Sequence, residues 1–168
     1  MITASLTQQM IAFCAGNLHD VNHFLKVTAF ARTIGQLEGL DERTQLTLEL
    51  TAIVHDIACP LCREKYGRAS GELQEKESEA LLRPFLAAFD LDETMRERII
   101  HLVSHHHTYT GVDGMDWQIL LEADFLVNAC EGNMNREAIM NREAIESFRN
   151  KVFRTPTGIS LLNNMYLK

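Results

Sequence analysis

Residues that break helices or form disulfide cross-links are scarce in this sequence. Of its 168 residues, three are proline, four are cysteine and one is tryptophan. A helical chain of this length can bury a core without disulfides, so we expect its cysteines to be reduced thiols of a cytoplasmic protein. Cys59 and Cys62 have the spacing of a redox or zinc motif, but no βαβ context or second cysteine pair accompanies them. Two ordinary loop thiols are therefore the favoured interpretation.

Positive charge and long apolar runs are scarce as well. Lysine and arginine total 16 against 23 aspartates and glutamates, which gives a net charge of −7. This balance argues against a nucleic-acid partner, because such proteins present a basic face. No apolar run approaches the roughly 20 residues of a membrane span, and the first residues lack a signal-peptide pattern, so no membrane partner is expected. A small anionic substrate remains compatible, since a local cation or metal ion can override the global field.

Helical spacing of apolar residues runs through almost the whole chain, whereas alternating strand patterns are absent. The sequence therefore predicts an all-α fold in a single domain over residues 1–168, with a core at about 17–131 and a helical extension at about 134–168. Asp20, Asp41 and Asp92 are predicted N-caps. The predicted helices cover about residues 7–17, 20–39, 41–58, 75–89, 92–106, 116–130, 136–153 and 159–166. Residues 59–74 contain a proline and two glycines and are predicted to form the longest loop.

The most informative feature is the pair His55-Asp56, which follows the apolar run 48–54. An imidazole and a carboxylate at the end of a buried helix are costly unless they bind something. His23 and Asp124 lie in two further apolar helices, although each alone could be a hydrogen-bonded core residue. Two nitrogen and two oxygen donors suit a divalent ion such as Mn²⁺, Fe²⁺, Co²⁺, Ni²⁺, Zn²⁺ or Mg²⁺. Four ligands would leave two positions of an octahedral ion for water or substrate.

This ordered set, within the contexts Asp20-x-x-His23, Ala52–Ile57 and Glu122–Val127, resembles the HD-domain metal-dependent phosphohydrolase superfamily, in particular a branch of small bacterial proteins. The resemblance covers about residues 17–131. It implies a helical bundle of about six to eight helices and hydrolysis of a phosphoester. It also implies that His23, His55, Asp56 and Asp124 hold the metal, with Asp56 orienting or deprotonating the attacking water.

Departures from the family pattern narrow the expected activity. Several dinuclear members carry a further histidine early in the helix after the His-Asp loop, where this chain has Gln74 or Glu75. One metal ion is therefore expected rather than two. Signatures of cyclic-di-GMP phosphodiesterases and guanosine tetraphosphate hydrolases are missing, which leaves a small phosphate ester, expected to be a nucleotide. The alternatives are a non-catalytic metal- and nucleotide-binding sensor module and, for a dinuclear iron site, an oxygenase.

A run of histidines supplies further candidates. Dinuclear members of the family that this chain resembles carry a His-His pair at about this point, so His105 and His106 are predicted to act in catalysis, as a second-metal ligand or in phosphate binding or proton transfer. Their alternative is one supporting histidine with solvated neighbours, and His107 is expected to be exposed.

Three residues are candidates for substrate binding. Lys26 lies three positions after His23 and could contact phosphate, or it could be a solvated lysine. Tyr66 could stack on a base and Arg68 could contact phosphate from a loop that covers the site, or that loop could be merely polar. A homodimer is a further expectation.

Overall fold

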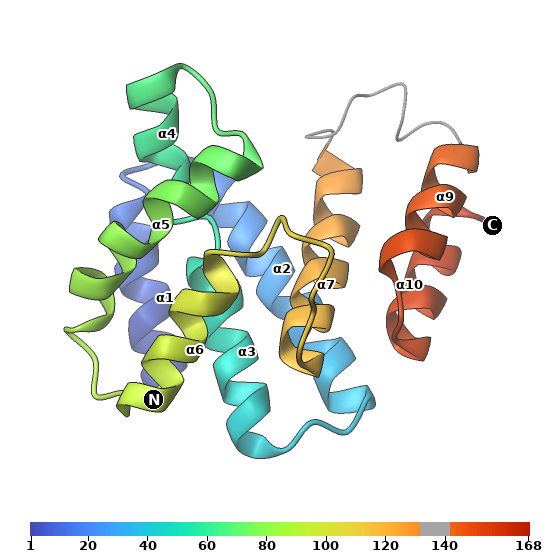
Figure 1. The fold of residues 1–168 in the computed structure, drawn as a ribbon, viewed down its shortest axis with the longest axis horizontal. Helices are drawn as coiled ribbons and strands as arrows, with labels where there is room; N and C mark the ends of the chain where they lie inside the picture. The colour runs from blue at the N-terminus through green and yellow to red at the C-terminus, as the bar shows by residue number, and fades with distance from the viewer. Residues whose placement is uncertain (132–141) are drawn as a thin grey trace.

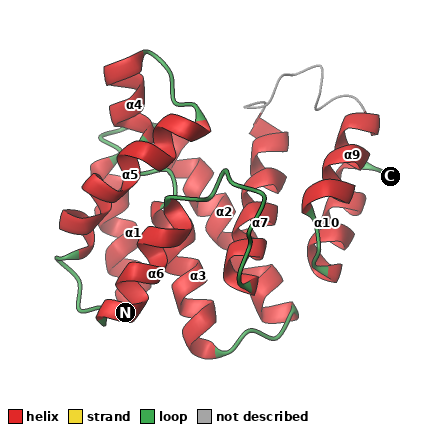
Figure 2. Ribbon diagram, in the orientation of Figure 1, coloured by secondary structure: helices red, strands yellow, loops and turns green. Residues whose placement is uncertain are grey.

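The computed structural model describes residues 1–131 and 142–168, and this part of the chain is helical with no strand (Figures 1 and 2). The all-α prediction is therefore confirmed. None of the described helices is long and apolar enough to cross a membrane. The helix predicted from residue 136 begins outside the described residues. The helices are α1 (Ile2–Phe13), α2 (Leu18–Leu37), α3 (Glu42–Val54), α4 (Cys59–Tyr66), α5 (Gly71–Leu86), α6 (Glu93–Val103), α7 (Met115–Glu131), α9 (Arg142–Val152) and α10 (Pro156–Tyr166).

The prediction of a long loop at residues 59–74 is wrong. Helix α4 and the first turn of α5 occupy most of this segment. Pro60 lies in the first turn of α4, where its missing N–H removes no helical hydrogen bond. Gly67 ends that helix with a φ of 70°, a left-handed conformation that favours glycine. The proline and glycine therefore mark the two ends of a short helix. Cys59 and Cys62 are free, buried thiols within it.

Side-chain caps explain where the other central helices begin. Asp41 accepts hydrogen bonds from the backbone of Arg43 and Thr44, as predicted for the start of α3. Asp92 caps α6 in the same way. The prediction for α2 is wrong by three residues, because Asn17 is the cap and accepts from the backbone N–H of Asp20. The carboxylate of Asp20 instead accepts a hydrogen bond from Arg63.

Helices α2, α3 and α7 form the centre of the bundle (Figure 1). α2 packs along both α3 and α7, and α3 also contacts α1 and α6. One apolar cluster joins α2 and α7 to the C-terminal helices, through side chains such as Ile34, Leu126 and Leu162. A second cluster joins α1, α3, α5 and α6, through side chains such as Leu6 and Ile53. Burial of these side chains fixes the spacing of the three central helices.

A buried carboxylate of α7 binds the start of α10 through hydrogen bonds. Glu122, which is fully buried, accepts hydrogen bonds from the backbone N–H groups of Arg154 and Thr155 at 2.6 and 3.0 Å. It also accepts from Gln118 Nε2 at 2.7 Å and from the hydroxyl of Thr155, which caps α10. One side chain therefore satisfies the donors at the turn between α9 and α10.

Substituting this carboxylate should weaken the C-terminal helices. We expect Glu122→Ala to lower the free energy of unfolding by about 2 to 4 kcal/mol, because several buried donors lose their acceptor. Urea denaturation followed by circular dichroism measures this change. Glu79→Ala, which alters an exposed ion pair, is the control and should change stability by less than about 1 kcal/mol. Equal stability of the two variants would contradict the assignment.

Candidate metal centre

The structure brings the four predicted ligands together from three helices. His23 comes from α2, Asp124 from α7, and His55 and Asp56 follow the last residue of α3. His23 Nε2 lies 3.1 Å from Asp124 Oδ1, 3.2 Å from His55 Nε2 and 3.4 Å from Asp56 Oδ2. His55 Nε2 lies 3.5 Å from Asp124 Oδ1 and 3.6 Å from Asp56 Oδ1. Donor atoms of His23, His55 and Asp56 are close enough to hold one metal ion.

Each imidazole of the centre is oriented by a hydrogen bond on its other nitrogen. His55 Nδ1 donates to Ala52 O at 2.8 Å, and His106 Nδ1 donates to Val103 O at 2.7 Å. His23 Nδ1 lies 2.8 Å from Glu131 Oε2. With Nδ1 engaged in this way, Nε2 of each ring faces the centre, where it can bind a metal ion once it carries no proton. This arrangement is typical of metal-binding histidines, whose second nitrogen donates to a carbonyl or carboxylate.

Glu131 is a residue that the sequence interpretation missed. It is the last residue of α7 and lies seven positions after Asp124, so the two carboxylates share one face of that helix. This spacing was the signal that could have found it. Lys26 Nζ donates to Glu131 Oε1 at 2.9 Å. Lys26, predicted to contact substrate, therefore contacts the carboxylate that supports His23 and does not line the cavity above the centre.

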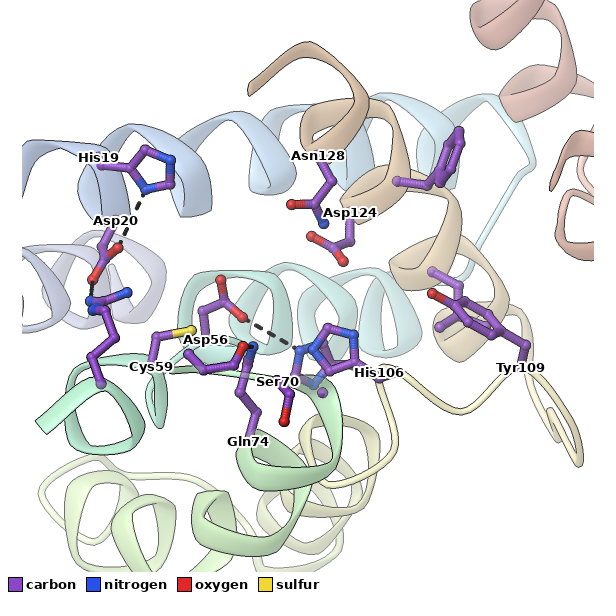
Figure 3. Close-up of a pocket in the computed structure, with 16 residues that line it drawn as sticks. His19, Asp20, Asp56, Cys59, Ser70, Gln74, His106, Tyr109, Asp124 and Asn128 are labelled. Carbon is purple, nitrogen blue, oxygen red and sulfur yellow. Dashed lines mark hydrogen bonds and ion pairs between the residues drawn. The ribbon is translucent and has the colours of Figure 1, made fainter. Parts of the chain in front are cut away.

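A cavity of about 460 Å³ opens above the centre (Figure 3). Asp56 and Asp124 line it, whereas His23 and His55 lie buried beneath. The cavity therefore gives a small molecule access to the carboxylate side of the ligand set. Its lining comprises His19, Asp20, Asp56, Cys59, Arg63, Ala69, Ser70, Gly71, Gln74, His106, His107, Tyr109, Leu121, Asp124, Phe125 and Asn128.

A second group of donors shares Asp56 with the first. Asp56, His106 and His107 have atoms close enough together to hold an ion, and His106 Nε2 lies 3.5 Å from Asp56 Oδ1. Among the described residues, the buried Nε2 atom of His107 and the buried Oε1 atom of Gln74 have no hydrogen-bond partner, and His106 Nε2 has the ion pair with Asp56 alone. Unpaired buried polar atoms are costly, so their concentration around Asp56 marks a place built to receive a ligand.

Of the two histidines predicted to act in catalysis, only His106 lines the cavity. The ring of His105 instead packs against those of His101 and Trp117, at centroid distances of 4.5 and 5.7 Å. His107, expected to be exposed, is partly buried and lines the cavity. A Cβ at position 71 would lie 2.7 Å from His107 Cγ, so only glycine lets this ring pack against the start of α5.

The residues predicted in the covering loop lie elsewhere. Tyr66 donates to Glu77 Oε1 at 2.6 Å, and neither Tyr66 nor Arg68 lines the cavity. Arg63 lines it instead and donates to Asp20. The difference follows from α4, because a helix presents Arg63 to the cavity and directs Tyr66 toward α5.

The charges of the centre stabilise one another. Burial alone would lower the pKa of His23, but the carboxylates of Asp124 and Asp56 raise it to about 10. Burial would raise the pKa values of Asp56 and Asp124, but the neighbouring imidazoles hold both below their usual range. In the metal-free protein at pH 7, His23 is therefore protonated and both carboxylates are ionised.

Metal binding should release the proton of His23. A histidine ligand must be neutral, so we expect at least one proton per ion at pH 7 and an affinity that rises about tenfold per pH unit toward pH 10. Titration calorimetry with Mn²⁺ in buffers of different ionisation enthalpy measures the release. Glu79→Ala, which alters an exposed ion pair with Arg83 away from the ligand set, should leave it unchanged. Identical binding enthalpies in all buffers would contradict the prediction.

Removing the support of His23 should weaken metal binding. We expect Glu131→Ala to raise the dissociation constant for Mn²⁺ about 10- to 100-fold, and Glu131→Gln to raise it less, because an amide oxygen can still accept from Nδ1. Competition with a fluorescent chelator measures the constant. Glu77→Ala removes a carboxylate that contacts Lys65 and Tyr66 and serves as the control. Equal constants in the Glu131 and Glu77 variants would exclude a positioning role.

Comparison with known proteins places this geometry in a family. No curated protein matches the chain. The model of the HD domain family matches residues 20–126, which is more than half of the chain and includes His23, His55, Asp56 and Asp124 in that order. Together with the helical bundle and the ligand geometry, this match shows that the chain belongs to the HD domain family, whose members are generally metal-dependent hydrolases.

Proposed function

We propose that this protein is a cytoplasmic, metal-dependent phosphohydrolase that acts on a small phosphate ester, most simply a nucleotide. The observation that carries the proposal is the convergence of His23, His55, Asp56 and Asp124 on one point at the floor of a cavity. The cavity volume of about 460 Å³ is in the range of small-molecule sites.

The four residues would hold a divalent ion, with Mn²⁺, Fe²⁺, Co²⁺, Ni²⁺, Zn²⁺ and Mg²⁺ as candidates. When bound, such an ion stabilises charge on a phosphoryl oxygen and lowers the pKa of a bound water. One ion fits the ligand set of His23, His55, Asp56 and Asp124. Asp56, His106 and His107 would hold a second ion, if one binds.

Asp56 is the residue best placed to act on the attacking water. It faces both donor groups, with Oδ2 3.4 Å from His23 Nε2 and Oδ1 3.5 Å from His106 Nε2. Its side chain is 23% exposed, whereas His23 and His55 are buried. The carboxylate can therefore reach a water in the cavity, orient it and accept its proton.

His106 is placed to donate a proton, whereas Asp56 is placed to accept one. Burial alone would lower its pKa, but Asp56 outweighs that effect and raises it. The Nδ1 bond to Val103 fixes the ring, so Nε2 presents any proton toward Asp56 and the cavity. An imidazolium there can donate to a phosphoryl oxygen or to the leaving group.

The deciding experiment combines elemental analysis with a phosphate-release assay on wild type and Asp56→Asn. The wild type should contain about one transition metal per chain and release phosphate from nucleotides. Asp56→Asn should lose most of the metal and at least about 100-fold in turnover, because the ligand and the proton acceptor disappear together. Asp90→Asn, an exposed loop substitution, should retain both properties.

Other outcomes assign other functions. Tight binding of metal and nucleotide without phosphate release would replace the hydrolase by a sensor module. Two irons per chain with a visible absorption band would favour an oxygenase. Absence of metal after reloading with Mn²⁺ would overturn the proposed centre.

A further inference from the structure

The cavity above the metal centre has two chemically different ends. Figure 3 shows His19 and Asp20 at one end and Tyr109 at the other, with Asp56 and His106 between them. Leu121 and Phe125 also line the cavity, and both are apolar and almost completely buried. We call Tyr109, Leu121 and Phe125 the apolar wall. Unlike the opposite end, it offers a substrate carbon surface and an aromatic ring.

Aromatic packing from the C-terminal part of the chain holds this wall in place. Phe148 of α9 stacks on Phe125 with a centroid distance of 3.8 Å and an interplanar angle of 12°. It also meets the ring of Tyr109 edge to face, at 5.5 Å and 88°. The ring of Phe153 meets that of Phe125 edge to face, at a centroid distance of 5.6 Å. Because α9 lies outside the family match at residues 20–126, the wall depends on a segment that the family model does not cover.

The charges around the cavity limit how many phosphates a ligand can carry. Asp20, Asp56 and Asp124 contribute three carboxylates to the lining. Among the described residues that line the cavity, Arg63 is the single arginine or lysine, and it donates to Asp20. A polyphosphate chain requires several cationic partners. A ligand with one phosphoryl group and an uncharged organic group matches this lining better than a polyphosphate does.

We propose that the apolar wall is a subsite for a flat, uncharged ring carried by a phosphomonoester, with Tyr109 as its contact residue and Phe148 as its positioning residue. The proposal rests on the proposed function and names the substrate class of the same cavity. Tyr109 is 48% exposed, so part of its ring is available to a ligand. Aromatic contacts combined with burial of apolar area provide the affinity for such a ring.

Two phosphonates that differ in one ring test the subsite without requiring turnover. Phenylphosphonate and methylphosphonate present the same headgroup to Mn²⁺-loaded protein, and titration calorimetry gives both dissociation constants. We expect phenylphosphonate to bind at least about tenfold more tightly than methylphosphonate, because its ring leaves water for the apolar wall. Cyclohexylphosphonate separates stacking on Tyr109 from simple burial and should fall between the two.

Variants identify the residues that generate the preference. Tyr109→Ala should reduce the ratio of the two dissociation constants to about threefold or less. Phe148→Leu should reduce it in part while methylphosphonate binding stays constant. Phe13→Ala, which alters an exposed aromatic pair with Phe85, is the control and should keep the wild-type ratio. Circular dichroism establishes that each variant is folded.

The outcomes separate the subsite from the proposed function. Equal affinity for the two phosphonates in a protein that releases phosphate from esters would overturn the subsite and leave the hydrolase standing. A wild-type ratio in Tyr109→Ala would overturn the role of the wall. Failure to bind either phosphonate, together with no phosphate release, would overturn the proposed function and the subsite with it.

Discussion

The mutual pairing of two imidazoles and two carboxylates in the interior is the interaction on which the rest of this structure depends. His23 and His55 are 2% and 0% exposed, and Asp124 is 7% exposed. A lone charge at that depth would be expensive, so each group requires the others or a metal ion. This requirement fixes the positions of α2, α3 and α7 relative to one another along their axes. A slip of one residue in any of them would rotate its ligand by about 100° into the apolar core.

The four candidate ligands could be predicted because histidine and aspartate are common metal-binding residue types and occur here in the order of the family pattern. His55 and Asp124 lie in or directly after apolar runs, and His23 precedes the apolar pair Phe24-Leu25, so each is a polar side chain at a position where burial is expected. Glu131 was harder to find, since its seven-residue distance from Asp124 gives only a shared helix face. Its contact with His23 follows from the packing of α2 along α7, which no local pattern reveals. Lys26 was placed at the substrate for the same reason.

The residues around the cavity show where local patterns stop being informative. His105 and His106 are neighbours of the same type, yet only one of them reaches Asp56, because successive residues near a helix end point in directions about 100° apart. The sequence likewise does not show which side chain of α4 and the following turn faces the cavity, among Arg63, Tyr66 and Arg68. Composition predicted cations and an aromatic ring here, whereas the phase of a short helix decided that Arg63 faces the cavity. The N-caps Asp41 and Asp92 were predictable because capping is a local interaction.

Gln74 is a position where one substitution would change the set of donors around the cavity. Its side chain is 6% exposed and lines the cavity together with Asp56, His106 and His107. Its Oε1 atom has no hydrogen-bond partner within the described part of the chain. The codons for glutamine and histidine differ only in their third base. A single nucleotide change would therefore add an imidazole at one of the two positions, Gln74 or Glu75, where several dinuclear relatives are expected to carry it. Its neighbour Gly71 has no such freedom, because any added carbon would collide with His107. In the proposed centre, a histidine at position 74 would extend the group of donors formed by Asp56, His106 and His107, while Gly71 keeps its place against His107.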